Sequence, residues 1–240
     1  MLVISVAGIV FGIEHAYSHI ARQCASYVVD AEPMHIFSVT PEMIARERAS
    51  ASAEVSDGYC ESLAAYRELS RLMMQHDALL LHAAVIELDG RAIAFSARSG
   101  TGKSTHIKLW RRVLGDRVQI VNGDKPIVRF SDDGTPIAYG TPWAGKEGWQ
   151  RNVAVPLRSI VILRRGETDR LLPISREEAA LELLGQILLG DTEAEAAASM
   201  ELLDRLIKAV ELRVLYCTPT EEAARVAYSG LLGKEKEKEQ

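Results

Sequence analysis

The chain has 240 residues, of which 48% are hydrophobic and 25% are charged, a balance typical of one α/β domain of ordinary size or of one domain with a small appendage. The formal net charge is −5, whereas proteins that bind nucleic acid usually carry an excess of positive charge, so we expect no nucleic-acid partner. The three cysteines are widely spaced and form no C-x-x-C pair, which argues against a disulfide framework or a zinc site and favours a cytoplasmic protein.

Residues 1–76 are predicted to form a small α+β subdomain. The apolar run at 2–13 has no basic residue before it and is too short to cross a bilayer, so it is predicted to be a buried strand and we expect no membrane partner. Strands are also predicted over 26–30 and 35–39, and helices over 41–53 and 60–76. This subdomain has no catalytic motif, so we assign it acceptor recognition or contacts within a homo-oligomer.

Residues 77–232 are predicted to form a second, larger domain of the α/β class. Two strands, 79–88 and 91–96, flank Asp89-Gly90, which is a strong signal for a two-residue hairpin. Further strands are predicted over 118–121, 126–130, 159–163 and 212–216, and helices over 103–113, 175–189, 193–210 and 220–232. Residues 233–240 alternate in charge and are predicted to be a disordered tail.

Residues 97–105, ARSGTGKST, match the phosphate-binding pattern G-x-x-x-x-G-K-S/T except that Ala97 replaces the first glycine. A strand is predicted before this segment and a helix after it, as the pattern requires. The glycines let backbone N–H groups point at phosphate oxygens, Lys103 supplies a positive charge, and the Ser104 hydroxyl is a ligand for Mg²⁺. The predicted ATP-binding residues are Ser99, Gly100, Thr101, Gly102, Lys103, Ser104 and Thr105.

Two further residues are candidates for the same site. Asp124 follows the predicted strand 118–121 and lies 20 residues beyond Ser104, where a carboxylate ligand for Mg²⁺ is needed. The alternative that Asn122-Gly123-Asp124 is simply a hairpin turn stays open beside this role. His82 lies within an apolar strand; it is either an ordinary core histidine or, through pairing of its strand with the strand before the loop, a ring that reaches the site.

The run LLLHAAVIELDGRAIAFSARSGTGKST resembles the catalytic core of the HPr kinase/phosphorylase family, and more closely the HPr-kinase-like serine kinases found with peptide-modifying gene clusters. That superfamily is related to the ATP-dependent phosphoenolpyruvate carboxykinases. The resemblance covers residues 78–165 and rests on His82, on the loop at 97–104 and on Asn122-Gly123-Asp124. It implies that residues 77–232 form a P-loop kinase domain, with a core of HPr kinase/PEP carboxykinase type and the subdomain 1–76 beside it.

The resemblance also implies roles for individual residues. Lys103 and the backbone amides of 99–104 would hold the phosphates, and Ser104 and Asp124 would hold Mg²⁺. HPr kinases usually carry two adjacent aspartates, and Gly123 stands where the first would be, so the general base is left open between Asp124 and His82. No segment matches the loop associated with the reverse, phosphorolytic reaction, so phosphatase activity is not carried over.

The segment 139–152 is rich in glycine, aromatic and basic residues. It is interpreted as a lid over the acceptor, in which Lys146 or Arg151 neutralises charge on the transferring phosphate as an arginine finger does. Lys125 is a further candidate for phosphate contact. The alternative is that Trp143 and Trp149 anchor a loop onto the core and that the charges are merely solvated.

These patterns predict an ATP-dependent, Mg²⁺-assisted kinase that phosphorylates a serine hydroxyl in a peptide, in a small protein or in free serine. Asp124, His82, Lys103 and Arg151 are its predicted catalytic residues. Two alternatives stay open: a carboxykinase-like phosphotransferase that acts on a small acid, and a nucleotide-binding regulator or ATPase without a phospho-acceptor.

Overall fold

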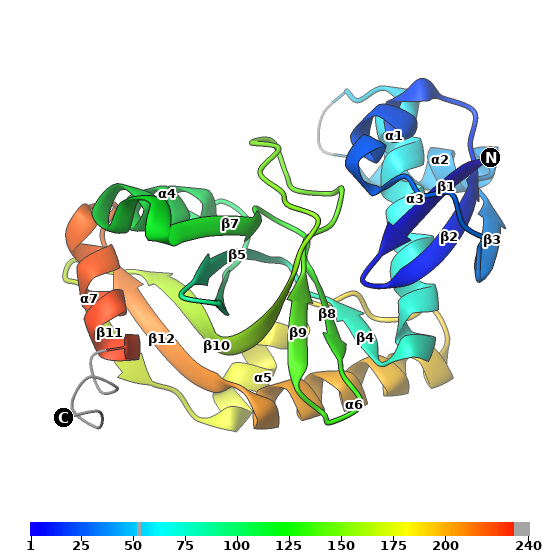
Figure 1. Cartoon of the computed structure of the whole chain (residues 1–240). Coiled ribbons are helices and arrows are strands. Elements are labelled where there is room, and N and C mark those ends of the chain that lie inside the picture. Colours follow the sequence, from blue (N-terminus) through cyan, green and yellow to red (C-terminus); the bar gives the residue numbers. More distant parts are fainter. Residues whose placement is uncertain (52–53, 233–240) are drawn as a thin grey trace.

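The computed structural model describes residues 1–51 and 54–232, and the predicted tail at 233–240 lies outside the described residues. Two lobes lie side by side, an N-terminal lobe up to residue 76 and a core lobe over 77–232 (Figure 1). The core lobe is built on a mixed nine-stranded sheet, which confirms the α/β class. None of the helices in the described ranges is both long and apolar enough to span a membrane.

The N-terminal lobe combines a three-stranded sheet with three helices. The run predicted as one strand over 2–13 is a hairpin, because Ala7 and Gly8 both adopt positive φ between β1 and β2. The strand predicted over 26–30 is also wrong, since a 3-10 turn occupies Ala25–Tyr27. The elements are β1 (Leu2–Val6), β2 (Ile9–Glu14), α1 (Ser18–Gln23), β3 (His35–Ser38), α2 (Pro41–Ser50) and α3 (Asp57–Met73).

The core sheet has the strand order β4-β8-β9-β10-β6-β5-β7. The strand β12 pairs with β10 on the edge opposite β6, and it also pairs with β11. The strand β10 is long enough to pair with β9 near its start and with both β6 and β12 further on. The strands are β4 (Ala78–Leu80), β5 (Ala83–Leu88), β6 (Arg91–Ser96), β7 (Val118–Asn122), β8 (Ile127–Phe130), β9 (Pro136–Tyr139), β10 (Ala154–Arg165), β11 (Arg170–Pro173) and β12 (Glu211–Cys217).

Helices cover both faces of the central strands, which explains why those strands are apolar at nearly every position. Val85 and Ile162 pack on the side of α5 (Arg176–Leu184) and α6 (Glu193–Ala209). Phe95 and Val161 pack on the side of α4 (Lys103–Leu114) and α7 (Glu221–Leu232). Figure 1 shows α5 and α6 beneath the sheet, with α4 and α7 on its opposite side. The result is a three-layer core lobe.

The pairing of three strands creates the edge on which the site is built. The strand β5 lies antiparallel between β6 and β7, so its start lies beside the ends of both neighbours. The hairpin predicted at Asp89-Gly90 is confirmed by the pairing of β5 with β6 and by positive φ at both residues. The hairpin alternative for Asn122-Gly123-Asp124 is wrong, because β7 pairs with β5 whereas β8 pairs with β4 and β9.

Candidate active site

The predicted phosphate loop leaves the end of β6 and enters α4, as the sequence pattern requires. Gly100 and Gly102 have φ values of 77° and 118°, in the region that favours glycine, and an added Cβ at either position would meet nothing within 4 Å. Backbone conformation rather than crowding therefore requires glycine there. Ala97 has no positive φ and is buried in the cluster around Phe95, which accounts for its replacing the usual first glycine.

Lys103 starts α4 and points back beneath the loop. Its Nζ atom lies 3.0 Å from the carbonyl oxygen of Ala97 and 2.9 Å from Nε2 of His82, and the side chain is buried. Burial lowers the pKa of Lys103, the carboxylate of Asp124 opposes this shift, and the charge of Lys125 adds to it. The ammonium group is thus held at the strand ends, next to the two other predicted catalytic side chains.

His82 and Asp124 lie on either side of this edge and contact each other. Oδ1 of Asp124 is 3.1 Å from Nε2 of His82, and its Oδ2 accepts a hydrogen bond of 2.7 Å from Nζ of Lys125. Burial by itself raises the pKa of Asp124, but the hydrogen bond to His82 and the charge of Lys125 outweigh it and hold that pKa well below its usual range. The Asp124 carboxylate is therefore a poor proton acceptor. His82 is placed at the cluster, as the second of its two interpretations expected.

The backbone at Asp124 is fixed by Asn122, which was named from the sequence as part of the Asn122-Gly123-Asp124 motif but was given no role of its own. Oδ1 of Asn122 accepts hydrogen bonds from the amides of Asp124 and Lys125, at 2.9 and 2.7 Å. An Asn that turns back on the next amides is a known local signal, and it was present in the sequence. Gly123 lies between Asn122 and Asp124 and leaves no room for a side chain, since an added Cβ would lie 2.8 Å from the carbonyl oxygen of Ala144. A second aspartate therefore does not fit at position 123.

These groups line one cleft of about 760 Å³ between the two lobes. From the phosphate loop and α4 it is lined by Ser99, Gly100, Gly102, Lys103, Ser104 and Thr105. From the strand ends it is lined by His82, Gly123, Asp124 and Lys125. The N-terminal lobe contributes Gln23, Tyr59 and Leu63. Thr101, also predicted to bind ATP, lines a separate hollow of about 240 Å³ beside Arg98 and Arg165.

The donor set of the cleft suits Mg²⁺ bound together with a phosphate. Ser104 and Asp124 supply a hydroxyl and a carboxylate to the same cleft. Within the described ranges, no group of three or more His, Cys, Asp and Glu side chains is arranged to hold a metal ion. Since Mg²⁺ commonly takes one or two protein oxygens and completes its shell with phosphate and water, this small set fits the ion.

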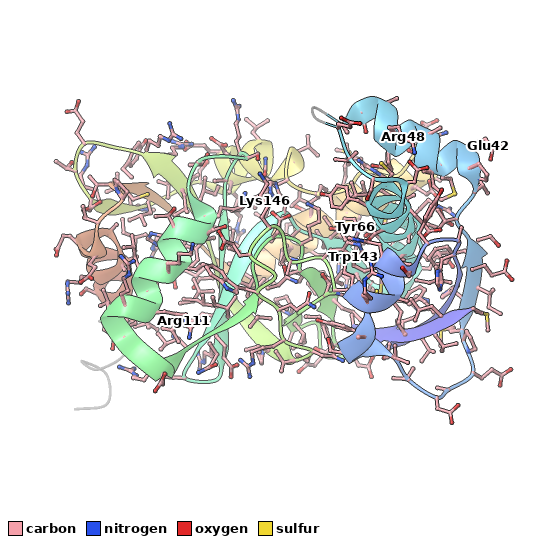
Figure 2. All side chains as sticks on the ribbon, turned by 90° about the horizontal axis from the view of Figure 1, so that it is seen from above. Glu42, Arg48, Tyr66, Arg111, Trp143 and Lys146 are labelled. Carbon is pink, nitrogen blue, oxygen red and sulfur yellow. The ribbon has the colours of Figure 1, made fainter. Side chains whose placement is uncertain are left out.

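The segment between β9 and β10 is anchored by its first tryptophan. Trp143 is buried, its Nε1 donates to the carbonyl oxygen and hydroxyl of Ser62, and its ring lies 5.0 Å from that of Tyr66 (Figure 2). Trp149 lies against Lys108, whose Nζ is 4.8 Å from the ring centre. For both tryptophans the anchoring alternative describes the structure. Lys146, exposed and lining the cleft, is the basic residue of this segment that a phosphate group in the cleft would meet.

Arg151 is not brought to the cleft. Its guanidinium pairs with Glu87 at 2.9 Å, on β5, and Arg151 is not among the described residues that line the cleft. Its backbone amide donates to the carbonyl oxygen of Val121, so it belongs to the bridge between this segment and β7. The structure thus gives no support to Arg151 as a catalytic residue, and we leave it out of the proposed set.

Comparisons with known proteins place the chain in a family. The family model described as SynChlorMet cassette protein ScmC matches residues 62–190, which is more than half of the chain and includes the phosphate loop, His82 and Asp124. Among solved structures, the Hpr(Ser) kinase/phosphatase from Coxiella burnetii has 14% sequence identity and a TM-score of 0.35, with 67% of this chain and 96% of that chain covered. A search of curated proteins found no match.

The matching family is not the HPr kinase/phosphorylase family that the sequence resembles, so that narrower assignment stays a prediction. By the match over residues 62–190, the chain belongs to the family of the SynChlorMet cassette protein ScmC.

Proposed function

We propose that this protein is an ATP-dependent kinase that transfers the γ-phosphate to a serine hydroxyl of a peptide, a small protein or free serine. The observation that carries the proposal is the convergence of Lys103, His82 and Asp124 beside a glycine-containing loop, all lining one cleft. Structural ion pairs occur in many folds, but a loop with positive-φ glycines at the start of a helix is built to hold phosphate. The combination of both features in one cleft favours phosphoryl transfer.

The residues of the cleft divide the work of binding. Backbone amides of 99–104 and the Lys103 ammonium would hold the phosphates, and Ser104 and Asp124 would hold Mg²⁺. When bound, Mg²⁺ neutralises negative charge on the phosphate oxygens. Lys125 and Lys146 line the same cleft and bring further positive charge to the acceptor side. Phosphoryl transfer needs mainly positioning and charge neutralisation, and these side chains supply both.

We assign the role of proton acceptor to His82 rather than to Asp124. The low pKa of Asp124 makes its carboxylate a weak base and suits it to bind a cation. Nε2 of His82 lines the same cleft, next to Lys103 and Asp124. In the reaction, a bond forms between the serine oxygen and the γ-phosphorus, the bond from that phosphorus to the β,γ-bridging oxygen breaks, and the serine proton passes to Nε2.

The proposal is tested with ATP labelled in its γ-phosphate. The full chain is incubated with labelled ATP, Mg²⁺ and either free serine or peptides that contain serine, and each peptide is matched with a copy that carries alanine instead. Label on serine that is absent from the alanine copies supports the kinase. Release of free phosphate that does not depend on any acceptor contradicts it and favours the ATPase alternative.

A further inference from the structure

Gln186, which follows α5, holds the catalytic histidine candidate by both its backbone and its side chain. The amide of His82 donates to the carbonyl oxygen of Gln186 at 2.7 Å. Nδ1 of His82 lies 2.9 Å from Oε1 of Gln186. Leu81 and Ile187 form a β-bridge beside these contacts. The segment after α5 therefore runs along the strand end that carries His82, and Gln186 is fixed to the residue whose ring it contacts.

This contact distinguishes the two nitrogens of the His82 ring. The Gln186 amide has its oxygen turned toward the ring, and in this orientation it accepts a hydrogen bond from a proton on Nδ1. Nε2, on the other side of the ring, faces Nζ of Lys103 at 2.9 Å and Oδ1 of Asp124 at 3.1 Å. In a neutral ring that carries its proton on Nδ1, Nε2 has a free lone pair and can accept a hydrogen bond from Lys103.

We infer that Gln186 is a positioning residue that keeps Nδ1 of His82 protonated and so leaves Nε2 as the nitrogen that exchanges a proton with the cleft. Its consequence for catalysis rests on the proposed kinase function, whereas its consequence for the histidine tautomer does not. Orienting partners of this kind are a general feature of sites in which a histidine acts through one nitrogen. Here the partner is a neutral amide, which orients the ring without adding a negative charge behind it.

The charged groups that face His82 come from two elements. Lys103 comes from the start of α4, and Asp124, with Lys125 against its second oxygen, comes from the segment after β7. None of the three contacts the Nδ1 side through any hydrogen bond or ion pair found within the described ranges, where Gln186 is the partner. Gln186 is therefore the residue whose replacement should change which ring nitrogen carries the proton.

The first test is nitrogen NMR of the imidazole groups in the ligand-free protein, with the His82 signal assigned by its loss in His82→Gln. We expect the wild-type chain to show His82 protonated at Nδ1. In Gln186→Leu the population should move toward protonation at Nε2, because Asp124 then becomes the stronger partner. A matched control is Gln119→Leu, which changes an exposed glutamine on β7 and should leave the His82 signal unchanged.

Phosphoryl transfer gives the second readout. Gln186→Leu should lower kcat at least about tenfold with KM for ATP nearly unchanged, which is the pattern expected for loss of orientation rather than of binding. Gln186→Glu keeps an acceptor for Nδ1, so it should keep the wild-type tautomer and retain most of kcat.

A wild-type His82 protonated only at Nε2 would overturn the inference, whether or not the protein transfers phosphate. An unchanged tautomer together with an unchanged kcat in folded Gln186→Leu would overturn it as well. If the wild-type chain shows no transfer to any acceptor, the kinase proposal fails alone, and the NMR result still decides the role of Gln186. If Gln186→Leu does not fold, the wild-type spectrum and Gln186→Glu decide it.

Discussion

The cleft has two walls that are held by different kinds of contact. The first wall carries the charged groups and belongs to the core lobe. The second wall faces it and belongs to the N-terminal lobe. On the core lobe, His82, the phosphate loop and Asp124 follow directly from strands of one sheet, and backbone hydrogen bonds tie them together; the amide of Ala83, for example, donates to the carbonyl oxygen of Asp124 at 3.0 Å. On the N-terminal lobe, Tyr59 and Leu63 lie on one helix, which side chains such as Trp143 join to the core.

The first wall holds its groups precisely, and the second wall can adapt. Strand ends in a paired sheet fix the groups that must meet phosphate oxygens, since a small displacement there costs catalysis. A wall joined by side chains tolerates change in its position and composition, which suits recognition of an acceptor. We call the side-chain contacts between the two lobes the joint. If this division is correct, changes in the first wall should affect the chemical step, and changes at the joint should affect stability and acceptor binding.

The largest effect is expected for Lys103→Ala, in the first wall. Removing the buried ammonium should lower phosphoryl transfer at least about a thousandfold, or about 4 kcal/mol, because no other buried cation in the described part of the chain reaches the same position. Lys108→Ala, one turn further along α4 on an exposed side chain, is the matched control and should change transfer less than about threefold. Both rates are measured with labelled ATP at saturating acceptor, and an active Lys103→Ala enzyme would remove the loop from the mechanism.

The next largest effect is expected for the pH dependence of the free energy of unfolding, in which a histidine of each lobe can be compared. His106 on α4 is buried beneath the phosphate loop, and burial lowers its pKa from 6.5 to about 4. Its Nε2 accepts from Nε1 of Trp110, and its Nδ1 has no partner among the described residues. Folding thus favours the neutral ring, so the unfolded chain takes up protons first as the pH falls. The stability is complete above pH 6.5 and is lost progressively down to pH 4, by about 3 kcal/mol in all.

Urea unfolding at several pH values measures this loss. His106→Gln keeps an acceptor for Trp110 but does not titrate, so most of the difference between neutral and acidic pH should disappear in that variant. His76, at the joint between the lobes, also has its pKa lowered by burial and by the neighbouring His35 and Arg129, but its side chain is only partly buried. His76→Gln should therefore remove less of the pH dependence, and an equal or larger effect would show that the joint controls acid stability.

Sequence patterns predicted the core lobe more fully than the N-terminal lobe. The run predicted as one strand over 79–88 is divided into β4 and β5, which lie apart in the sheet, but β5 and β6 are buried on both faces and their hairpin follows from a strong turn signal at Asp89-Gly90. The Ala7-Gly8 turn was missed because alanine seldom adopts positive φ, so the run at 2–13 gave no sign of a reversal. The strands β9 and β11, each of four residues, were missed because segments this short carry little periodicity.

The residues of the candidate site were also predicted only in part. Residues that follow a strand within one local motif, such as Lys103 and Asp124, were predicted and lie together. Arg151 was predicted from charge and proximity in the sequence, but pairing with Glu87 on β5 turns it away from the cleft. Gln186 was missed because its contact with His82 spans 104 residues, and only the packing of α5 against the sheet brings the two together.

Asp124→Asn tests the first wall with a smaller expected effect than Lys103→Ala. The amide keeps the size of the side chain and an oxygen for Lys125, but it removes the negative charge that we propose for Mg²⁺. Turnover should fall at least about a hundredfold, or about 2.7 kcal/mol, and should depend less steeply on Mg²⁺ concentration. Asp204→Asn, at an exposed position on α6, is the control. Turnover within a few-fold of wild type would mean that the metal ligand lies elsewhere.

Trp143→Phe tests the joint and should have the smallest effect of the four changes. Phenylalanine keeps much of the contact with Tyr66 but leaves the carbonyl oxygen and hydroxyl of Ser62 without their donor, so the free energy of unfolding should fall by about 1–2 kcal/mol. Hydrogen exchange should rise chiefly in α3, because the buried indole holds that helix to the core. Trp149→Phe, six residues along the same segment and less buried, is the matched control and should cost less than about 1 kcal/mol.

We also expect Trp143→Phe to raise KM for the acceptor while KM for ATP stays nearly unchanged, since only the second wall moves. Equal changes in both KM values would show that the two walls form one rigid unit and that the division between them is wrong.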